Sequence, residues 1–172
     1  MNKADNIEYV IPIKGLSVGK YHYDFTVGGD FFREYENRDI DGAQLKISLT
    51  LDKHATFIDV KGIFKGAVTT KCDRCLGELE VEIDFTASLL VKFGEITQGE
   101  ESEEIITLDP SESDLDLKQF FYDYIYLALP IQRVHKEDEC DLEMLEKLQN
   151  YRVTNVEERK NSPFEKLKNL MN

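Results

Sequence analysis

Strict alternation of apolar and polar residues runs through much of the first half of the chain and limits the folds open to it. Runs of this kind cover residues 21–27, 45–51, 58–64, 79–85 and 87–93. Because successive side chains of a strand point to opposite faces, a period of two predicts antiparallel strands with one covered and one solvated face. The sequence therefore predicts an antiparallel sheet or open barrel of about six strands in the first half of the chain.

A helical pattern follows the strands. Apolar residues at helical spacing are Leu117, Phe120, Phe121, Tyr124 and Ala128. Ser113 or Asp114 is expected to cap this helix, and Pro130 is expected to end it at Leu129. Residues 141–151 predict a second helix. Strands followed by helices favour the α+β class, here with one long amphipathic helix packed on the sheet and short C-terminal helices closing one side.

The length of 172 residues is typical of about one domain. We expect residues 1–152 to form a single α+β domain and residues 153–172 to form a polar connector with a short amphipathic segment. The stretch between Phe93 and Leu117 contains nine acidic and no basic residues. It is predicted to be a solvated loop around the short apolar pair Ile105 and Ile106, serving either solubility or the docking of a basic protein.

The chain is strongly acidic. Lys and Arg number 21 and Asp and Glu number 34, which gives a formal net charge of −13. Nucleic-acid affinity comes mainly from Lys and Arg, so this charge argues against general nucleic-acid binding and favours basic partners. No apolar run reaches the roughly 18 residues of a membrane helix. The N-terminus lacks the apolar core of a signal peptide, so we expect a cytoplasmic protein without membrane contact.

The three cysteines and one of the histidines form the most specific chemical pattern. Cys72 and Cys75 are spaced C-x-x-C, and His135 and Cys140 are spaced H-x4-C. Three thiolates and one imidazole make the ligand set of a closed structural zinc site, which would join the sheet to the segment after the helix. Gly77 is expected to let the backbone turn beyond the second thiol.

Two other interpretations of these residues stay open. The first is three reduced thiols beside an ordinary histidine. The second is a thiol oxidoreductase, in which a C-x-x-C at a helix N-terminus has a lowered thiol pKa. The residues after Cys75 alternate like a strand, which disfavours the redox interpretation.

Basic residues flank all four candidate ligands, namely Lys71, Arg74, Arg133 and Lys136. They are expected either to offset the negative charge of a zinc ion with three thiolates or to contact the phosphates of RNA. The first interpretation is favoured, because four cations on so acidic a chain attract RNA weakly at physiological salt. The sequence has no phosphate-binding glycine loop and no nucleophile elbow, so no catalytic residue is assigned.

Several of these segments resemble the YceD-like family, a bacterial domain of unknown function. The resemblance rests on K-C-D-R-C-L-G at residues 71–77, on the helix opened by Asp116 and followed by Pro130, on His135 with Cys140, and on S-P-F at residues 162–164. It covers about residues 66–145 and the tail. Some relatives carry cysteine where this chain has His135, which fits a shared ligand position.

The resemblance implies a role in the synthesis, processing or stability of large-subunit (23S) ribosomal RNA. Family members are often encoded beside a small basic protein of the large ribosomal subunit. The leading hypothesis is therefore a non-enzymatic factor in ribosome biogenesis that contacts components of the large subunit, with weak RNA contact and no small-molecule substrate. One alternative is an acidic holding factor for a small basic ribosomal protein. Another is a thiol oxidoreductase or metal-dependent nuclease that uses the Cys/His cluster.

Overall fold

The computed structural model describes residues 9–37, 39–94, 105–136 and 139–151. Its main element is a five-stranded sheet in the order β2-β3-β4-β5-β6. The strands of this sheet are β2 (Gly19–Gly28), β3 (Ile40–Lys53), β4 (Phe57–Lys71), β5 (Glu78–Phe93) and β6 (Ile105–Leu108). The first four run antiparallel to one another in turn, whereas β6 lies parallel to β5.

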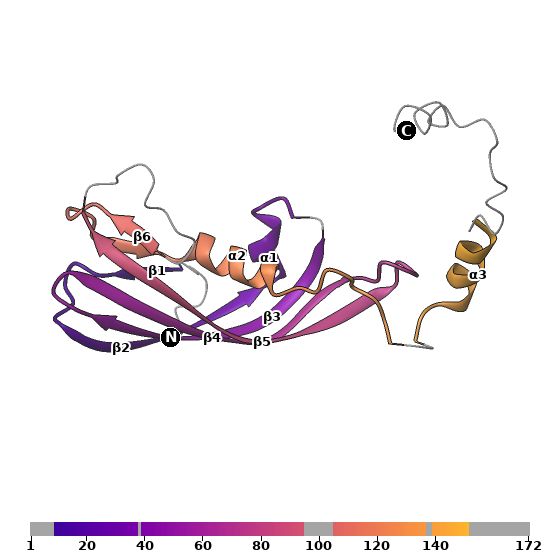
Figure 1. Cartoon of the computed structure of the whole chain (residues 1–172), viewed down its shortest axis with the longest axis horizontal. Helices are drawn as coiled ribbons and strands as arrows, with labels where there is room; N and C mark the ends of the chain where they lie inside the picture. Colours follow the sequence, from indigo (N-terminus) through magenta and orange to yellow (C-terminus); the bar gives the residue numbers. More distant parts are fainter. Residues whose placement is uncertain (1–8, 38, 95–104, 137–138, 152–172) are drawn as a thin grey trace, which may run out of the picture.

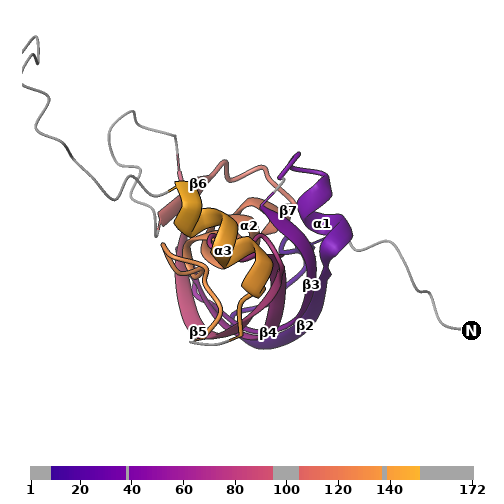
Figure 2. The same ribbon diagram turned by 90° about the vertical axis from the view of Figure 1, so that its right-hand side faces the viewer.

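Two short strands and three helices complete the described part of the fold. The strands β1 (Val10–Pro12) and β7 (Asp114–Asp116) pair antiparallel in a separate sheet. The helices are α1 (Gly29–Arg33), α2 (Lys118–Leu127) and α3 (Leu142–Tyr151). The main sheet curves around α2, as the view along the molecule shows (Figure 2), and α3 lies beyond one end of the strands (Figure 1).

The concave face of the sheet and α2 share one apolar core. In β3, Leu45, Ile47, Leu49 and Leu51 are buried and alternate with more exposed residues. From α2, the ring of Phe121 enters this core and lies 5.6 Å from Tyr9, 5.4 Å from Phe25 and 5.8 Å from Phe64, measured between centroids. Burial of these apolar and aromatic side chains is the main stabilising term of the fold.

One glycine of β4 fits where no other residue can. Gly66 has a φ of +142°, and a Cβ built on it would lie 2.0 Å from the carbonyl oxygen of Gln44. Gly66 pairs with Leu45, so the backbones of β3 and β4 come very close at this point.

We expect Gly66→Ala to lower the free energy of unfolding by about 3 kcal/mol or more, because the new methyl group meets backbone that cannot rotate away. Urea unfolding followed by circular dichroism measures this loss. Gly94→Ala is the matched control, because no atom lies within 4 Å of its added Cβ. Equal unfolding midpoints for the two variants would contradict the expectation.

The sheet predicted from alternation is confirmed, with a few short helices rather than a long one. The long amphipathic helix was wrong: α2 has ten residues and begins at Lys118. Residues 114–116 pair with β1 instead, so neither Ser113 nor Asp114 caps the helix. Asp116 accepts the first hydrogen bond, from the N–H of Lys118 at 2.8 Å. The helix ends before Pro130, as predicted.

Other predicted segments have different outcomes. Residues 142–151 form α3, as the second helical pattern predicted. Ile105 and Ile106 lie in β6 rather than in a solvated loop, since they pair with Leu90 and Val91. The predicted tail, residues 153–172, and most of the acidic segment, residues 95–104, lie outside the described residues. The single domain over residues 1–152 stays a prediction.

Candidate metal centre

The first two candidate ligands lie in the tight turn between the long strands β4 and β5. The N–H of Leu76 donates to the carbonyl of Cys72 at 2.9 Å, and the N–H of Cys72 donates to the carbonyl of Gly77 at 2.8 Å. These two bonds fold the chain so that Cys72 and Cys75 approach each other. Gly77 was expected to let the backbone turn here, but the left-handed residue of the turn is Leu76, whose φ is +59°.

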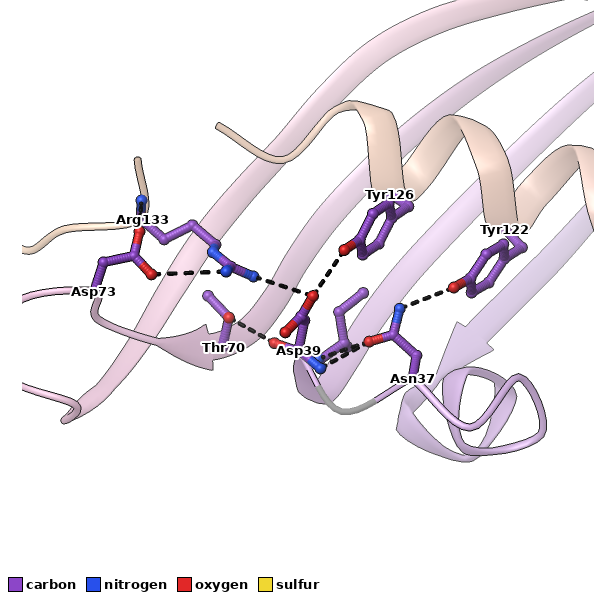
Figure 3. A network of polar contacts seen from close by, with 8 residues as sticks. Asn37, Asp39, Thr70, Asp73, Tyr122, Tyr126 and Arg133 are labelled. Atoms are coloured by element: carbon purple, nitrogen blue, oxygen red, sulfur yellow. Dashed lines mark hydrogen bonds and ion pairs between the residues drawn. The ribbon is translucent and has the colours of Figure 1, made fainter. Parts of the chain in front are cut away.

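The segment after α2 is tied to this turn by Asp73 and Arg133. The N–H of Asp73 donates to the carbonyl of Arg133, and the N–H of Arg133 donates to a carboxylate oxygen of Asp73, both at 2.7 Å. The Arg133 guanidinium also lies 3.6 Å from Asp73 and 3.9 Å from Asp39 (Figure 3). Residues far apart in the sequence are thereby held at one end of the sheet.

A polar network extends from Asp39 to α2 (Figure 3). Tyr126 donates its hydroxyl to the carboxylate of Asp39 at 2.7 Å, and Thr70 donates to the carbonyl of Asp39 at 2.6 Å. The hydrogen bond to Asp39 is the main cause that raises the pKa of Tyr126. Asn37 donates to the hydroxyl of Tyr122 at 3.0 Å. The network joins the sheet, α2 and the segment that carries His135.

The structure brings all four predicted ligands together. Their donor atoms lie within 4.8 Å of one another. The Sγ atoms of Cys72 and Cys140 are 3.8 Å apart, and Nδ1 of His135 is 3.4 Å from Sγ of Cys75 and 3.8 Å from Sγ of Cys140. In a tetrahedral zinc site, sulfur atoms lie about 3.8 Å apart, and sulfur and nitrogen about 3.6 Å, given the usual bond lengths. The cluster is therefore compatible with a zinc site.

The histidine ring is oriented by a backbone carbonyl. Nε2 of His135 lies 2.8 Å from the carbonyl oxygen of Glu78, at the start of β5. When Nε2 carries the proton and donates to this carbonyl, the lone pair of Nδ1 faces the three thiols. A carbonyl partner on the far nitrogen is the usual outer support of a metal-binding histidine.

Burial and hydrogen bonding shift the pKa values of the thiols in opposite directions. Burial alone would raise the pKa of Cys72, but the backbone N–H groups of Cys75, His135 and Arg74 outweigh it and lower that pKa to about 5. Burial, followed by the neighbouring thiols, raises the pKa of Cys140 to about 11. The site thus eases ionisation of Cys72 and of Cys75, whose pKa is also lowered by backbone hydrogen bonds, but opposes ionisation of Cys140 unless a cation is present.

The four flanking cations have different surroundings. Arg74 donates to the carbonyl of His135, and Arg133 pairs with Asp39 and Asp73, so both guanidinium groups contact the frame of the site. Lys71 and Lys136 are exposed. These placements do not test phosphate contact, which stays a prediction for all four.

The frame around the cluster could not be found from the sequence. Asp73 lies inside the C-x-x-C motif, but nothing in its spacing indicates that it holds Arg133. Asp39 and Tyr126 are single polar residues in segments without a motif, and Glu78 contributes only its backbone carbonyl. A contact that uses a carbonyl has no side-chain signature.

None of the described helices has the length and apolar character that crossing a bilayer takes. Comparison with curated proteins finds no match, and comparison with solved structures finds none either. A family model matches residues 60–171, a range that includes all four clustered residues. The model is that of YceD, described as the large ribosomal RNA subunit accumulation protein. The resemblance seen in the sequence is thereby confirmed, and the chain belongs to the YceD family.

Proposed function

We propose that this protein is a non-enzymatic cytoplasmic factor that supports the accumulation of 23S ribosomal RNA during ribosome biogenesis. The family match over residues 60–171 is the observation that carries this proposal. The match spans the turn between β4 and β5, α2 and the Cys/His cluster, so the family signal and the candidate metal centre coincide. The acidic charge of the chain favours contact with basic proteins of the large subunit over direct contact with RNA.

We further propose that Cys72, Cys75, His135 and Cys140 hold a structural zinc ion. The four donors would fill a tetrahedral coordination sphere and leave no open position for a substrate or a reactive water. When bound, the zinc would supply a fixed cross-link between the end of the sheet and the segment that leads to α3. Arg74 and Arg133 would then orient the ligands and offset the thiolate charge.

The thiol oxidoreductase alternative is less well supported. The side chains of Cys72 and Cys75 are 0 % and 4 % exposed, whereas a redox thiol must reach its substrate. Both residues lie in a turn between strands and not at the N-terminus of a helix. A low pKa at Cys72 suits a metal ligand as well as a nucleophile, so the support for the ligand role comes from the burial of the two thiols.

The zinc proposal predicts that affinity falls on acidification. At pH 7 Cys72 is already ionised, since its pKa is about 5, but Cys140, with a pKa of about 11, must release a proton to bind. Each proton released makes affinity rise by up to about tenfold per pH unit. Competition titration against a chromophoric chelator at about pH 6 and about pH 8 measures the slope. A pH-independent affinity would contradict ligation by Cys140.

Deletion and complementation test the proposed function. We expect deletion to lower mature 23S RNA relative to 16S RNA, and an intact copy to restore it. RNA blots and subunit profiles in sucrose gradients, under normal growth and under stress, measure both. Unchanged ribosomal RNA and unchanged subunit profiles in the deletion strain would overturn the proposal.

A further inference from the structure

Most of β5 has a neighbour on one side only. β4 pairs with β5 from Glu78 to Lys92, whereas β6 pairs only with Leu90 to Phe93. In Figure 1, β6 accordingly lies along one end of β5. Among the described residues, nothing pairs with the second edge of β5 between Glu80 and Leu89. An unpaired strand edge is a template for another strand.

Two hydrogen bonds establish which residues face this edge. The carbonyl of Glu78 accepts from His135, and the N–H of Gly94 donates to Leu108 at 3.0 Å, both away from β4. The register between β4 and β5 has no shift, so backbone groups alternate regularly along the strand. The N–H and C=O groups of the even-numbered residues from Glu80 to Ser88 therefore point to the open edge.

Three of these five residues have acidic side chains, and all five are exposed. Glu80, Glu82 and Asp84 point to the outer face, and across the sheet Glu80 and Glu82 oppose Thr69 and Ala67, which carry no charge. Among the described residues of β4, a cation pairs with Asp84 alone of these three, namely Lys65 at 3.3 Å. Residues directly opposite on neighbouring strands interact most strongly, so a strand added here would meet this row of carboxylates.

The inner face of the open edge is apolar and incompletely covered. Leu79, Val81 and Phe85 are half-buried, while the other inward residues of this stretch are buried, namely Ile83, Ala87 and Leu89. On the adjoining strand, Val60, Phe64 and Val68 are all fully buried. An added strand would extend this face with apolar side chains of its own. A strand that is complementary to this edge would therefore alternate basic residues on the outer face with apolar residues on the inner face.

We propose that the open edge of β5 binds an extended basic segment of a partner protein, which adds to the sheet as a further strand. The acidic row repels a second copy of the same edge and repels RNA, but it attracts a strand with Lys or Arg at alternate positions. The opposite edge strand, β2, carries Lys20, His22 and Asp24 on its outer face and offers no row of one sign.

A peptide titration with hydrogen exchange tests this on the full chain. The probe is a synthetic peptide of about nine residues that alternates Lys with Val or Thr, and the control peptide has the same composition in two blocks. We expect the alternating peptide to bind at least about tenfold tighter. On binding, the amides of the even-numbered residues from Glu80 to Ser88 should exchange about tenfold slower or more, whereas odd-numbered amides, already paired with β4, should not change.

Two sets of variants distinguish backbone pairing with β5 from attraction by its acidic side chains. Thr86→Pro removes an N–H that points to the open edge, so the fold should tolerate it while peptide binding is lost. Glu80→Lys with Glu82→Lys should weaken binding about tenfold, whereas Glu143→Lys with Glu146→Lys, the same charge change on exposed positions of α3, should have a smaller effect.

The outcomes decide the inference independently of the ribosomal role, because the probe is synthetic and no RNA is measured. Equal binding of both peptides without amide protection would mean attraction by charge alone and would overturn it. Even-numbered amides that are already protected in the free protein would mean that another part of this chain occupies the edge, which would also overturn it.

Discussion

Replacing Cys72 with Ser is expected to remove the zinc ion and to release α3 from the end of the sheet. A metal that joins Cys75 to His135 closes a loop of 60 residues. Closure of a loop of this length is worth about 4 kcal/mol by the chain-entropy argument, and we expect a loss of that order in the free energy of unfolding. Elemental analysis should fall from about one zinc per chain to none, and urea unfolding should report the lost stability.

The expected loss is local because the cluster has a small core of its own. Cys72, Cys75 and Cys140 pack with Leu79, Met144 and Leu145, separately from the main core. α3 has no fully buried residue. The ten or more kcal/mol typical of zinc-finger peptides should therefore not be lost in full, since the sheet folds around other residues. Amide exchange in α3 should approach that of an unfolded chain, while β3 and β4 stay protected and exchange faster only by the amount that the global loss of stability implies.

Lys71→Ser is the matched control, because it places the same residue beside the cluster at an exposed position that is not a ligand. It should keep its zinc and lose less than about 0.5 kcal/mol. A Cys72→Ser protein that still holds zinc would contradict the assignment of that ligand. One that keeps α3 protected without zinc would show that the metal is not structural.

How far the sequence predicted this protein depended on how local each signal was. The sheet was predictable because each strand alternates apolar and polar residues. The meeting of the Cys/His cluster was predictable because thiols and imidazole at C-x-x-C and H-x4-C spacing are rare by chance. The start of α2 was not predictable from the sequence. Asp114 could have capped the helix, but it pairs with β1 instead. Contacts between residues more than a hundred positions apart, such as Ile11 with Leu115, cannot be recognised from a local sequence pattern.

The same reasoning explains the other gaps. The alternation at Ile105 and Ile106 is too short to indicate a strand, and β6 exists because β5 offers an edge with which it can pair in parallel. The Asp39–Arg133–Tyr126 network depends on three polar residues that the fold brings together (Figure 3). Each of them alone is an ordinary surface residue in the sequence.

Phe121→Ala should produce the opposite pattern to Cys72→Ser, with stability lost and the metal kept. Phe121 is fully buried and its ring contacts Tyr9, Phe25 and Phe64 within the main core. Removing a buried aromatic ring loses its transfer free energy and leaves a cavity, which together cost about 3–5 kcal/mol. Urea unfolding measures this loss, and zinc content measured below the transition should stay at about one per chain.

Tyr151→Ala serves as the comparison, since its side chain is 86 % exposed and its removal should change stability by less than about 0.5 kcal/mol. Because the two clusters share no residue, the losses of Phe121→Ala and Cys72→Ser should add in the double variant. A double variant much more stable than the sum would mean that the metal centre and the main core unfold as one coupled unit. Zinc loss in Phe121→Ala alone, below its unfolding transition, would lead to the same conclusion, because the metal centre would then depend on packing inside the sheet rather than on its own ligands and frame.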